Sequence, residues 1–287
     1  MRTVEDVYDA ATLRRLQLVE LDILKAFDAL CAKYKLTYVA LFGTALGAIR
    51  HNGIIPWDDD IDVGMPRCDY DKLPELVAEM GEDYYFLNGQ VDPRYPFVTS
   101  RIMKRGTEFR MWSMRNSPIP SGIFLDIFCL DDLPDDTRKL RHQVLRCWLW
   151  EKLTVLRQQS QPNVPYRGLK RLAVHAACAV ASVVLKPLSP VWLHRRTQRA
   201  AAEWSGYPSN TVGWPFGINP RDCIYPRAII FPAGRHAFED TTIAIPADTP
   251  AMLRQTFGES YMTPLPEGQR SYIVPYRLSF GDEMAAV

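Results

Sequence analysis

Four acidic residues within five positions are the strongest chemical signal in the sequence: Asp58, Asp59, Asp60 and Asp62. In an extended chain successive side chains point to opposite faces, so Asp58, Asp60 and Asp62 share one face while Asp59 points away. Neighbouring carboxylates repel by about 1 kcal/mol at 4 Å in water, and by about 4 kcal/mol at an effective dielectric constant of 20. A divalent cation removes this repulsion, and hard oxygen ligands favour Mg²⁺ or Mn²⁺ over Zn²⁺. The spacing therefore predicts a metal site, with a solvated turn of acids as the alternative.

A further acid, Asp126, lies within the apolar run Ile123–Phe128. A carboxylate between large apolar side chains is either a core acid with a satisfied partner or a ligand on one face of a sheet. For Asp126 alone the two interpretations are equally good. The presence of the acids at 58–62 favours the interpretation of Asp126 as a ligand.

A glycine and a threonine precede the acids by about fifteen positions. Gly43 and Thr44 follow the apolar run 38–42 and open a helix-like segment. Backbone N–H groups at a helix start can hold a phosphate, and glycine permits its close approach. The pair predicts a phosphate-binding turn, although most such glycines only serve the turn itself.

Several cationic and aromatic side chains near these segments suit a phosphorylated ligand that carries a base: Arg50, Trp57, Arg67, Arg101, Lys104 and Arg270. Arginine gives bidentate phosphate contacts and lysine a point charge, with a surface role as the alternative for each. Trp57 either stacks on a planar or cationic group of a ligand, or anchors its turn in the core. We expect a structural role for His51, and we expect Asp59 to hold Arg50 or cap the turn.

Composition limits the class of protein. The 287 residues contain 34 Lys plus Arg and 33 Asp plus Glu, a net charge of +1, which argues against a nucleic-acid polymer as partner. A hydrophobic content of 47% with 23% charged residues indicates a folded globular chain. The six cysteines form no Cys-x-x-Cys pair, and the first fifteen residues include acids where a secretory signal would be apolar. Free thiols in the cytosol are therefore expected.

Hydrophobic periodicity predicts an α+β core, with helices and strands mixed along the chain. The expected helices are 4–34, 45–50, 69–80 with an aspartate cap, and 249–257, and the expected strands are 38–42, 61–65, 97–103, 123–128 and 242–245. Residues 137–205 are predicted to be mostly helical. Their most apolar part, 172–185, would span about 21 Å as a helix, which is too short to cross a membrane. A buried helix is the favoured interpretation, and the alternative is a surface helix whose bases Arg167, Lys170 and Arg171 touch anionic lipid.

The segment GTALGAIRHNGIIPWDDDIDVGMPRCDY, residues 43–70, resembles the signature of the LicD family, which includes bacterial phosphocholine-type transferases and shares a domain with fukutin and fukutin-related protein. FVTSRIMKRGT at 97–107, FLDIF at 124–128 and the tail from 238 to 270 agree in order. The resemblance implies a nucleotidyltransferase-like mixed sheet with flanking helices and a helical insertion. It divides the chain into a catalytic core at 1–136, the insertion at 137–205, and a C-terminal segment at 206–287 that packs back on the core.

The resemblance also implies an activity. A CDP-activated donor such as CDP-choline would transfer phosphocholine, or a similar phospho-alcohol group, to a hydroxyl of a glycan or lipid-linked glycan and release CMP. Asp60, Asp62 and Asp126 match the family's catalytic and metal-binding acids, and Asp58 matches a further metal ligand. Such an enzyme would lie in the cytoplasm, at the inner face of the membrane if the insertion touches lipid. Transfer of a nucleoside monophosphate to a small molecule, and non-catalytic glycan binding, are the alternatives.

Overall fold

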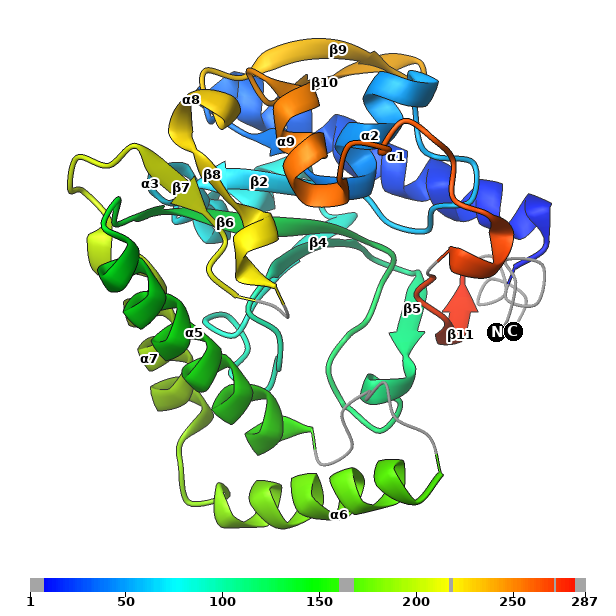
Figure 1. The fold of residues 1–287 in the computed structure, drawn as a ribbon. Helices are drawn as coiled ribbons and strands as arrows, with labels where there is room; N and C mark the ends of the chain where they lie inside the picture. Colours follow the sequence, from blue (N-terminus) through cyan, green and yellow to red (C-terminus); the bar gives the residue numbers. More distant parts are fainter. Residues whose placement is uncertain (1–7, 160–167, 217–218, 271, 282–287) are drawn as a thin grey trace.

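A mixed sheet lies at the centre of the computed structural model, which describes residues 8–159, 168–216, 219–270 and 272–281 (Figure 1). Its strands run in the order β1-β2-β6-β4-β3, and β7 and β8 continue the sheet from the far end of β6. The described strands are β1 Val39–Ala40, β2 Asp62–Pro66, β3 Tyr84–Leu87, β4 Ser100–Lys104, β5 Glu108–Met111, β6 Phe124–Leu133, β7 Thr211–Gly213, β8 Ile224–Pro226, β9 Gly234–Phe238, β10 Thr241–Ile245 and β11 Pro275–Ser279.

Helices flank this sheet and extend away from it: α1 Ala10–Tyr34, α2 Phe42–His51, α3 Arg67–Tyr70, α4 Leu73–Leu76, α5 Thr137–Gln158, α6 Gly168–Val184, α7 Pro190–Ala201, α8 Arg227–Ile230 and α9 Thr249–Phe257. The predicted α+β class is confirmed. Two small antiparallel pairs, β9 with β10 and β5 with β11, stand outside the central sheet.

Strand β6 fixes the geometry of the sheet, because it is the longest strand and has neighbours on both sides. It runs parallel to β2 and antiparallel to β4. In this register Asp62 of β2 and Arg101 of β4 both lie opposite Asp126 of β6. Three charged residues therefore form one row across the middle of the sheet.

Helix α1 covers this sheet with an apolar face that contacts β4 and β6. Its first turn is capped by Asp9, whose carboxylate accepts a hydrogen bond from the Thr12 N–H, and it ends at Lys35 in the left-handed conformation. Side chains at three-to-four spacing bury that face, as expected for an amphipathic helix. Two polar residues, Gln17 and Glu20, are buried among them.

The helical segment leaves and rejoins the sheet at one place. Leu133 near the end of β6 pairs with Thr211 at the start of β7, so residues 134–210 connect two adjacent antiparallel strands. Helices α5 and α7 pack together, with a small core of their own around Cys147 and Ala200. Helix α6 contacts α5 and lies far from the sheet (Figure 1).

The predicted burial of residues 172–185 is wrong. Only Ser182 of α6 is buried, and most of the large apolar side chains of this helix are exposed. Exposed fractions reach 85% at Leu169 and 70% at Val184. Among the described residues, no helix is long and apolar enough to cross a membrane.

Other helices and strands differ in extent from the prediction. The single helix expected at 69–80 is divided into α3, α4 and a 3₁₀ turn, because Pro74 cannot donate a helical hydrogen bond. Asp69 is not its cap, since its carboxylate accepts from the Thr37 N–H. The strand at 38–42 shortens because Phe42 already begins α2, and residues 4–7 of the first predicted helix lie outside the described residues.

Candidate metal and phosphate site

The row of charges across β2, β6 and β4 brings two of the predicted ligand acids together. Asp62 and Asp126 are cross-strand partners, and Asp126 is buried. The residues just before β2 complete the group, since one carboxylate oxygen each of Asp58, Asp59 and Asp60 lie within 4.8 Å of one another. Asp60 in turn interacts electrostatically with both Asp58 and Asp126. Acids from two segments about 65 residues apart therefore share one site.

The surroundings of these carboxyl groups disfavour their charged forms. Burial, followed by the charges of Asp58 and Asp126, raises the pKa of Asp60 to about 8. Burial and neighbouring Asp59 raise the pKa of Asp58 to about 7, and burial with Asp60 and Asp126 raises that of Asp62 well above its ordinary range. Such a set is unfavourable alone and suits a divalent cation with oxygen ligands. Their role as ligands stays a prediction.

The Gly-Thr turn supports the acids directly. The Asp62 N–H donates to the Thr44 hydroxyl at 2.8 Å, so Thr44 fixes the start of β2. A Cβ at Gly43 would lie 2.5 Å from Asp58 Oδ2, so only glycine lets this carboxylate pack against the helix start. The residue before helix α2, Leu41, makes no side-chain capping hydrogen bond. A phosphate there remains a prediction, while support of the acids by Gly43 and Thr44 is what the geometry shows.

Arg101 forms an ion pair with Asp126 and does not face solvent. Its Nε and Nη2 donate to the two oxygens of Asp126 at 2.7 and 3.1 Å, and both side chains are about 90% buried. The guanidinium also lies 3.6 Å from the ring centroid of Phe124. The planar guanidinium therefore fixes the plane of the Asp126 carboxyl group.

Asp59 has partners that the sequence did not predict, and the expected contact with Arg50 is wrong. Its Oδ2 accepts hydrogen bonds from the Tyr8 hydroxyl at 3.2 Å and from the Ile273 N–H at 2.9 Å. Residues close to both ends of the described chain thus meet at the acidic segment. Arg50 instead donates to His51 Nε2 and to the Tyr261 carbonyl.

Trp57 and its neighbours form an aromatic and cationic wall beside the acids. The Arg270 guanidinium lies 3.8 Å and that of Arg50 5.6 Å from the Trp57 ring centroid. Trp57, Arg270 and His51 also line a groove of about 540 Å³ with α1. The structure therefore places Trp57 at a surface that a ligand can reach, although Arg270 occupies one ring face.

Two predicted phosphate contacts have other partners. Lys104 is three positions from Arg101 on β4, so the two side chains leave opposite faces of the sheet, and Lys104 pairs with Asp22 of α1. Arg67 donates through Nε and Nη2 to the two oxygens of buried Asp131, both at 2.8 Å. These contacts thus hold Lys104 and Arg67 away from Asp126 and the acids at 58–62.

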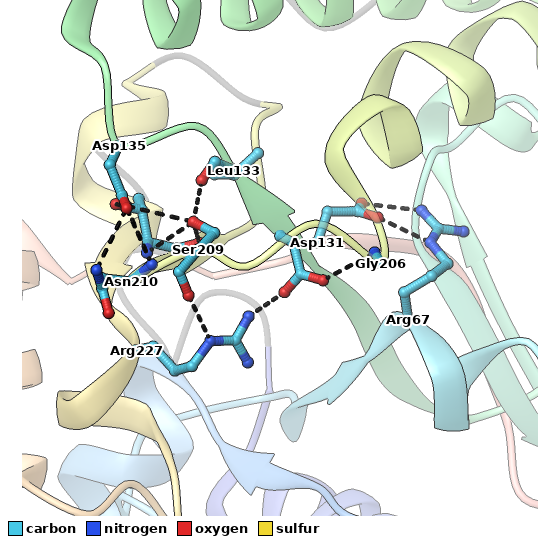
Figure 2. A network of polar contacts seen from close by, with 10 residues as sticks. Arg67, Asp131, Leu133, Asp135, Gly206, Ser209, Asn210 and Arg227 are labelled. Atoms are coloured by element: carbon cyan, nitrogen blue, oxygen red, sulfur yellow. Dashed lines mark hydrogen bonds and ion pairs between the residues drawn. The ribbon is translucent and has the colours of Figure 1, made fainter.

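The second group of acids lies at the other end of β6 (Figure 2). There Asp131 binds Arg67, Asp132 pairs with Arg227, and Asp135 accepts from the Thr211 hydroxyl at 2.7 Å. Each acid in this network has a base or hydroxyl partner. The network ties β6 and the residues after it to α3, β7 and α8.

Glu20 is the residue near the site that sequence analysis missed. It is fully buried on α1, and neither of its carboxylate oxygens has a hydrogen-bond partner. Burial and the charges of Asp60, Asp59, Asp58 and Asp62 raise its pKa well above the ordinary range. The signal that could have found it is an acid at a core position of an otherwise apolar helix face.

A mixed sheet with carboxylates on adjacent strands, next to a Gly-Thr helix start, is the arrangement expected of a nucleotidyltransferase-like domain. Residues 35–140 match the family described as "LicD/FKTN/FKRP, nucleotidyltransferase domain". These residues are therefore similar to a LicD-type nucleotidyltransferase domain. The matched residues contain every predicted metal ligand, whereas Glu20 and Arg270 lie outside them.

The lipopolysaccharide cholinephosphotransferase LicD of Haemophilus influenzae is 39% identical to this chain over 129 residues, which is 44% of this chain and 47% of that protein. Uncharacterized proteins of Rickettsia prowazekii and Rickettsia typhi are 39% and 41% identical over 57 residues, which is 20% of this chain in each case and 21% and 18% of those proteins. The chain thus spans about half the length of the Haemophilus protein and about a fifth of the Rickettsia proteins.

Proposed function

We propose that this protein is a metal-dependent phosphotransferase that moves phosphocholine, or a similar phospho-alcohol group, from a CDP-activated donor to a hydroxyl of a cell-surface glycan and releases CMP. The observation that carries the proposal is the set of half-buried Asp58, Asp60 and Asp62 with buried Asp126, which has one paired arginine and lies inside the matched residues. The Haemophilus relative, by its name, acts on lipopolysaccharide and transfers phosphocholine.

The acids fit a divalent cation in number and chemistry. Asp58, Asp60, Asp62 and Asp126 offer only oxygen donors, which suit Mg²⁺ or Mn²⁺; one oxygen each of Asp58 and Asp60 lie within 4.8 Å of each other, and Asp62 lies opposite Asp126 across β2 and β6. A cation bound there would neutralise the donor diphosphate and stabilise negative charge on the departing CMP.

The chain's own residues supply orientation. Arg101 fixes both oxygens of Asp126, so we assign to Asp126 the orientation of the acceptor hydroxyl for in-line attack at the distal phosphorus. Thr44 and Gly43 keep Asp62 and Asp58 at set positions. Trp57 and Arg50 border the acids and are suited to the base or choline end of the donor.

Helix α6 suits an acceptor that is attached to lipid. Its exposed apolar side chains recur at three-to-four spacing on one face: Leu169, Leu172, Val180, Val183 and Val184. Lys170 and Arg171 lie near its first turn. An apolar face with basic residues beside it fits the surface of an anionic bilayer. Vesicles of phosphatidylcholine and phosphatidylglycerol should retain the protein in flotation and lose the Val180→Asp/Val184→Asp variant, whereas Val91→Asp, which changes an exposed valine elsewhere, should float as the parent does.

The decisive assay incubates the protein with Mg²⁺, a panel of CDP-activated alcohols and a lipopolysaccharide acceptor, and follows CMP. We expect CMP release that EDTA abolishes and that Asp60→Asn removes, while Asp240→Asn, a change at an exposed acid, keeps it. Release of pyrophosphate from a nucleoside triphosphate would replace this proposal with nucleotidyl transfer. Absence of both products with all donors would contradict it.

A further inference from the structure

A pocket of about 440 Å³ lies where the helical insertion meets the core. Its wall consists of stretches before β4, after β5 and at the end of α5, together with the first residue of α7: 94–96, 113–118, 157–159 and Pro190. Hydrogen bonds join these stretches, since Gln158 Nε2 donates to the Tyr95 carbonyl at 3.3 Å and Gln159 Nε2 donates to Met114 Sδ at 3.8 Å. The pocket is therefore part of the packed boundary between α5 and the core.

The charge of this pocket is one-sided. Its described wall contains three basic residues and no acid: Arg94, Arg115 and Arg157. Arg94 is paired with Asp92 at 2.7 Å. Arg157 donates through Nε to the Leu188 carbonyl at 3.0 Å, and its described contacts include no carboxylate. The pocket therefore offers positive charge, from Arg157 above all, that an anionic ligand would balance.

An exposed pair of aromatic rings lies beside the pocket. Trp112 directly precedes the stretch 113–118, and its ring centroid is 4.9 Å from that of Tyr276 on β11. The two residues are 55% and 45% exposed. The guanidinium of Arg115, which belongs to the pocket wall, lies 5.9 Å from the Trp112 ring centroid. Such rings bind the apolar face of a ligand and leave its polar groups in water.

The pocket is connected to the acidic site through Phe97. This residue follows Pro96 of the pocket wall, and its ring centroid lies 5.5 Å from the Arg101 guanidinium. Arg101 in turn holds both oxygens of Asp126. The stretch that forms one side of the pocket therefore also packs against the ion pair of Asp126, the residue to which we assign the acceptor hydroxyl.

We propose that this pocket is an acceptor subsite for an anionic sugar. The phosphate or carboxylate group of the sugar would bind to Arg157 and Arg115, and its ring would lie against Trp112 and Tyr276. The inference rests on the proposed function, since it names the class of acceptor that the transferase would use. An anionic sugar combines the negative group and the apolar ring face that these residues suit.

Binding is tested by calorimetry without donor or metal. The probes are two matched charged and neutral pairs: glucose 1-phosphate with glucose, and trigalacturonate with maltotriose. We expect an anionic probe to bind about tenfold more tightly than its neutral partner, and added salt to weaken that binding. The anionic probe that binds more tightly identifies the group, phosphate or carboxylate, that the pocket takes.

Arg157 is the side chain whose replacement tests the pocket most directly. Arg157→Gln should weaken binding of the anionic probes by about tenfold, as expected for loss of a charged hydrogen bond, and Arg157→Lys should keep part of it. Arg141→Gln, a change at an exposed arginine elsewhere on α5, should bind the probes as the parent does.

Kinetics separates a role in binding from a structural one. With an anionic acceptor, Arg157→Gln should raise KM for that acceptor by about tenfold with a smaller change in kcat, whereas a folding defect would lower kcat and the temperature of unfolding together. Trp112→Ala, at an exposed side chain, gives the same comparison should Arg157→Gln fold poorly.

The outcomes distinguish this inference from the proposed function. Equal affinity for the charged and neutral probes, or anionic binding that Arg157→Gln leaves unchanged, would overturn the anion subsite and leave the proposed function standing. Anionic binding that depends on Arg157, in a protein that releases no CMP from any donor, would overturn the proposed function and leave the anion site.

Discussion

Strand β6 carries acids at both of its ends, and the two groups differ in charge balance. At its start Asp126 shares a site with Asp58, Asp60 and Asp62, for which Arg101 is the one base in a direct ion pair among the described residues. At its end Asp131 and Asp132 have Arg67 and Arg227, and Asp135 has hydroxyl and amide donors (Figure 2). The partners of the balanced group are sufficient to explain its acids as structural residues. For the unbalanced group we propose a cation, and that difference, not the number of acids, is what supports it as the functional site.

The largest effect should come from unbalancing the structural group. Arg67→Met leaves the fully buried Asp131 without its partner, so the free energy of unfolding should fall by about 3–5 kcal/mol. Denaturant titration measures the loss. Addition of Asp131→Asn should recover part of it, and a single variant as stable as the parent would show that the pair is dispensable.

Removing one acid from the unbalanced group should lower activity without lowering stability, in contrast to Arg67→Met. Asp60→Asn should reduce the transfer rate by about 10²–10³-fold while leaving the cation-free protein as stable as before or more so, because a buried like-charge contact is lost. Rate assays and thermal unfolding of one preparation measure both. Loss of stability together with activity would place Asp60 in the architecture instead.

Divalent cations should act at one end of β6 only. At a Mg²⁺ or Mn²⁺ concentration of 100 times Kd, the parent should gain about 2.7 kcal/mol of stability, which EDTA reverses. Arg67→Met should show the same gain from its lower baseline, and Asp60→Asn a reduced one. Differential scanning calorimetry with and without the cation measures these differences, and an equal gain in both variants would contradict a site built on Asp60.

A smaller effect is expected at Gly43. The Cβ of Gly43→Ala would force the Asp58 carboxylate to move, so the Mn²⁺ affinity and transfer rate should fall about tenfold with little loss of stability. Gly234→Ala, where the nearest atom lies at 3.6 Å, is the matched control. Unchanged Mn²⁺ affinity in Gly43→Ala would show that Asp58 is not a ligand.

The smallest effect should appear at Asp135. Hydrogen bonds from Thr211, Asn210 and Ser209 lower its pKa, so its contribution to stability is present above the ordinary aspartate pKa of about 3.9 and is lost as the pH falls through the lower folded value. Asp135→Asn should therefore unfold slightly earlier than the parent at pH 7, and the difference should vanish in strong acid. A difference that persists there would mean that packing, not charge, is responsible.

The fold class and the pairing of Asp62 with Asp126 could be predicted from the sequence. The alternation of apolar and polar residues around Asp62 and the apolar neighbours of Asp126 are local properties of each segment. The sequence could not predict partners that depend on the packing of distant segments. Asp59 meets Tyr8 and Ile273, Arg67 meets Asp131, and Lys104 meets Asp22. Glu20 was missed because the helix pattern was taken from its apolar positions, and α6 was predicted to be buried because hydrophobicity alone does not identify what covers a helix.

The pairing of Leu133 with Thr211 has a consequence for how such proteins can diversify. Everything between these two residues amounts to the loop of one β-hairpin, so its length and content can change without altering the row formed by Asp62, Asp126 and Arg101. A graft that exchanges residues 134–210 for the corresponding loop of a relative should therefore carry over that relative's choice of acceptor and leave the donor chemistry intact.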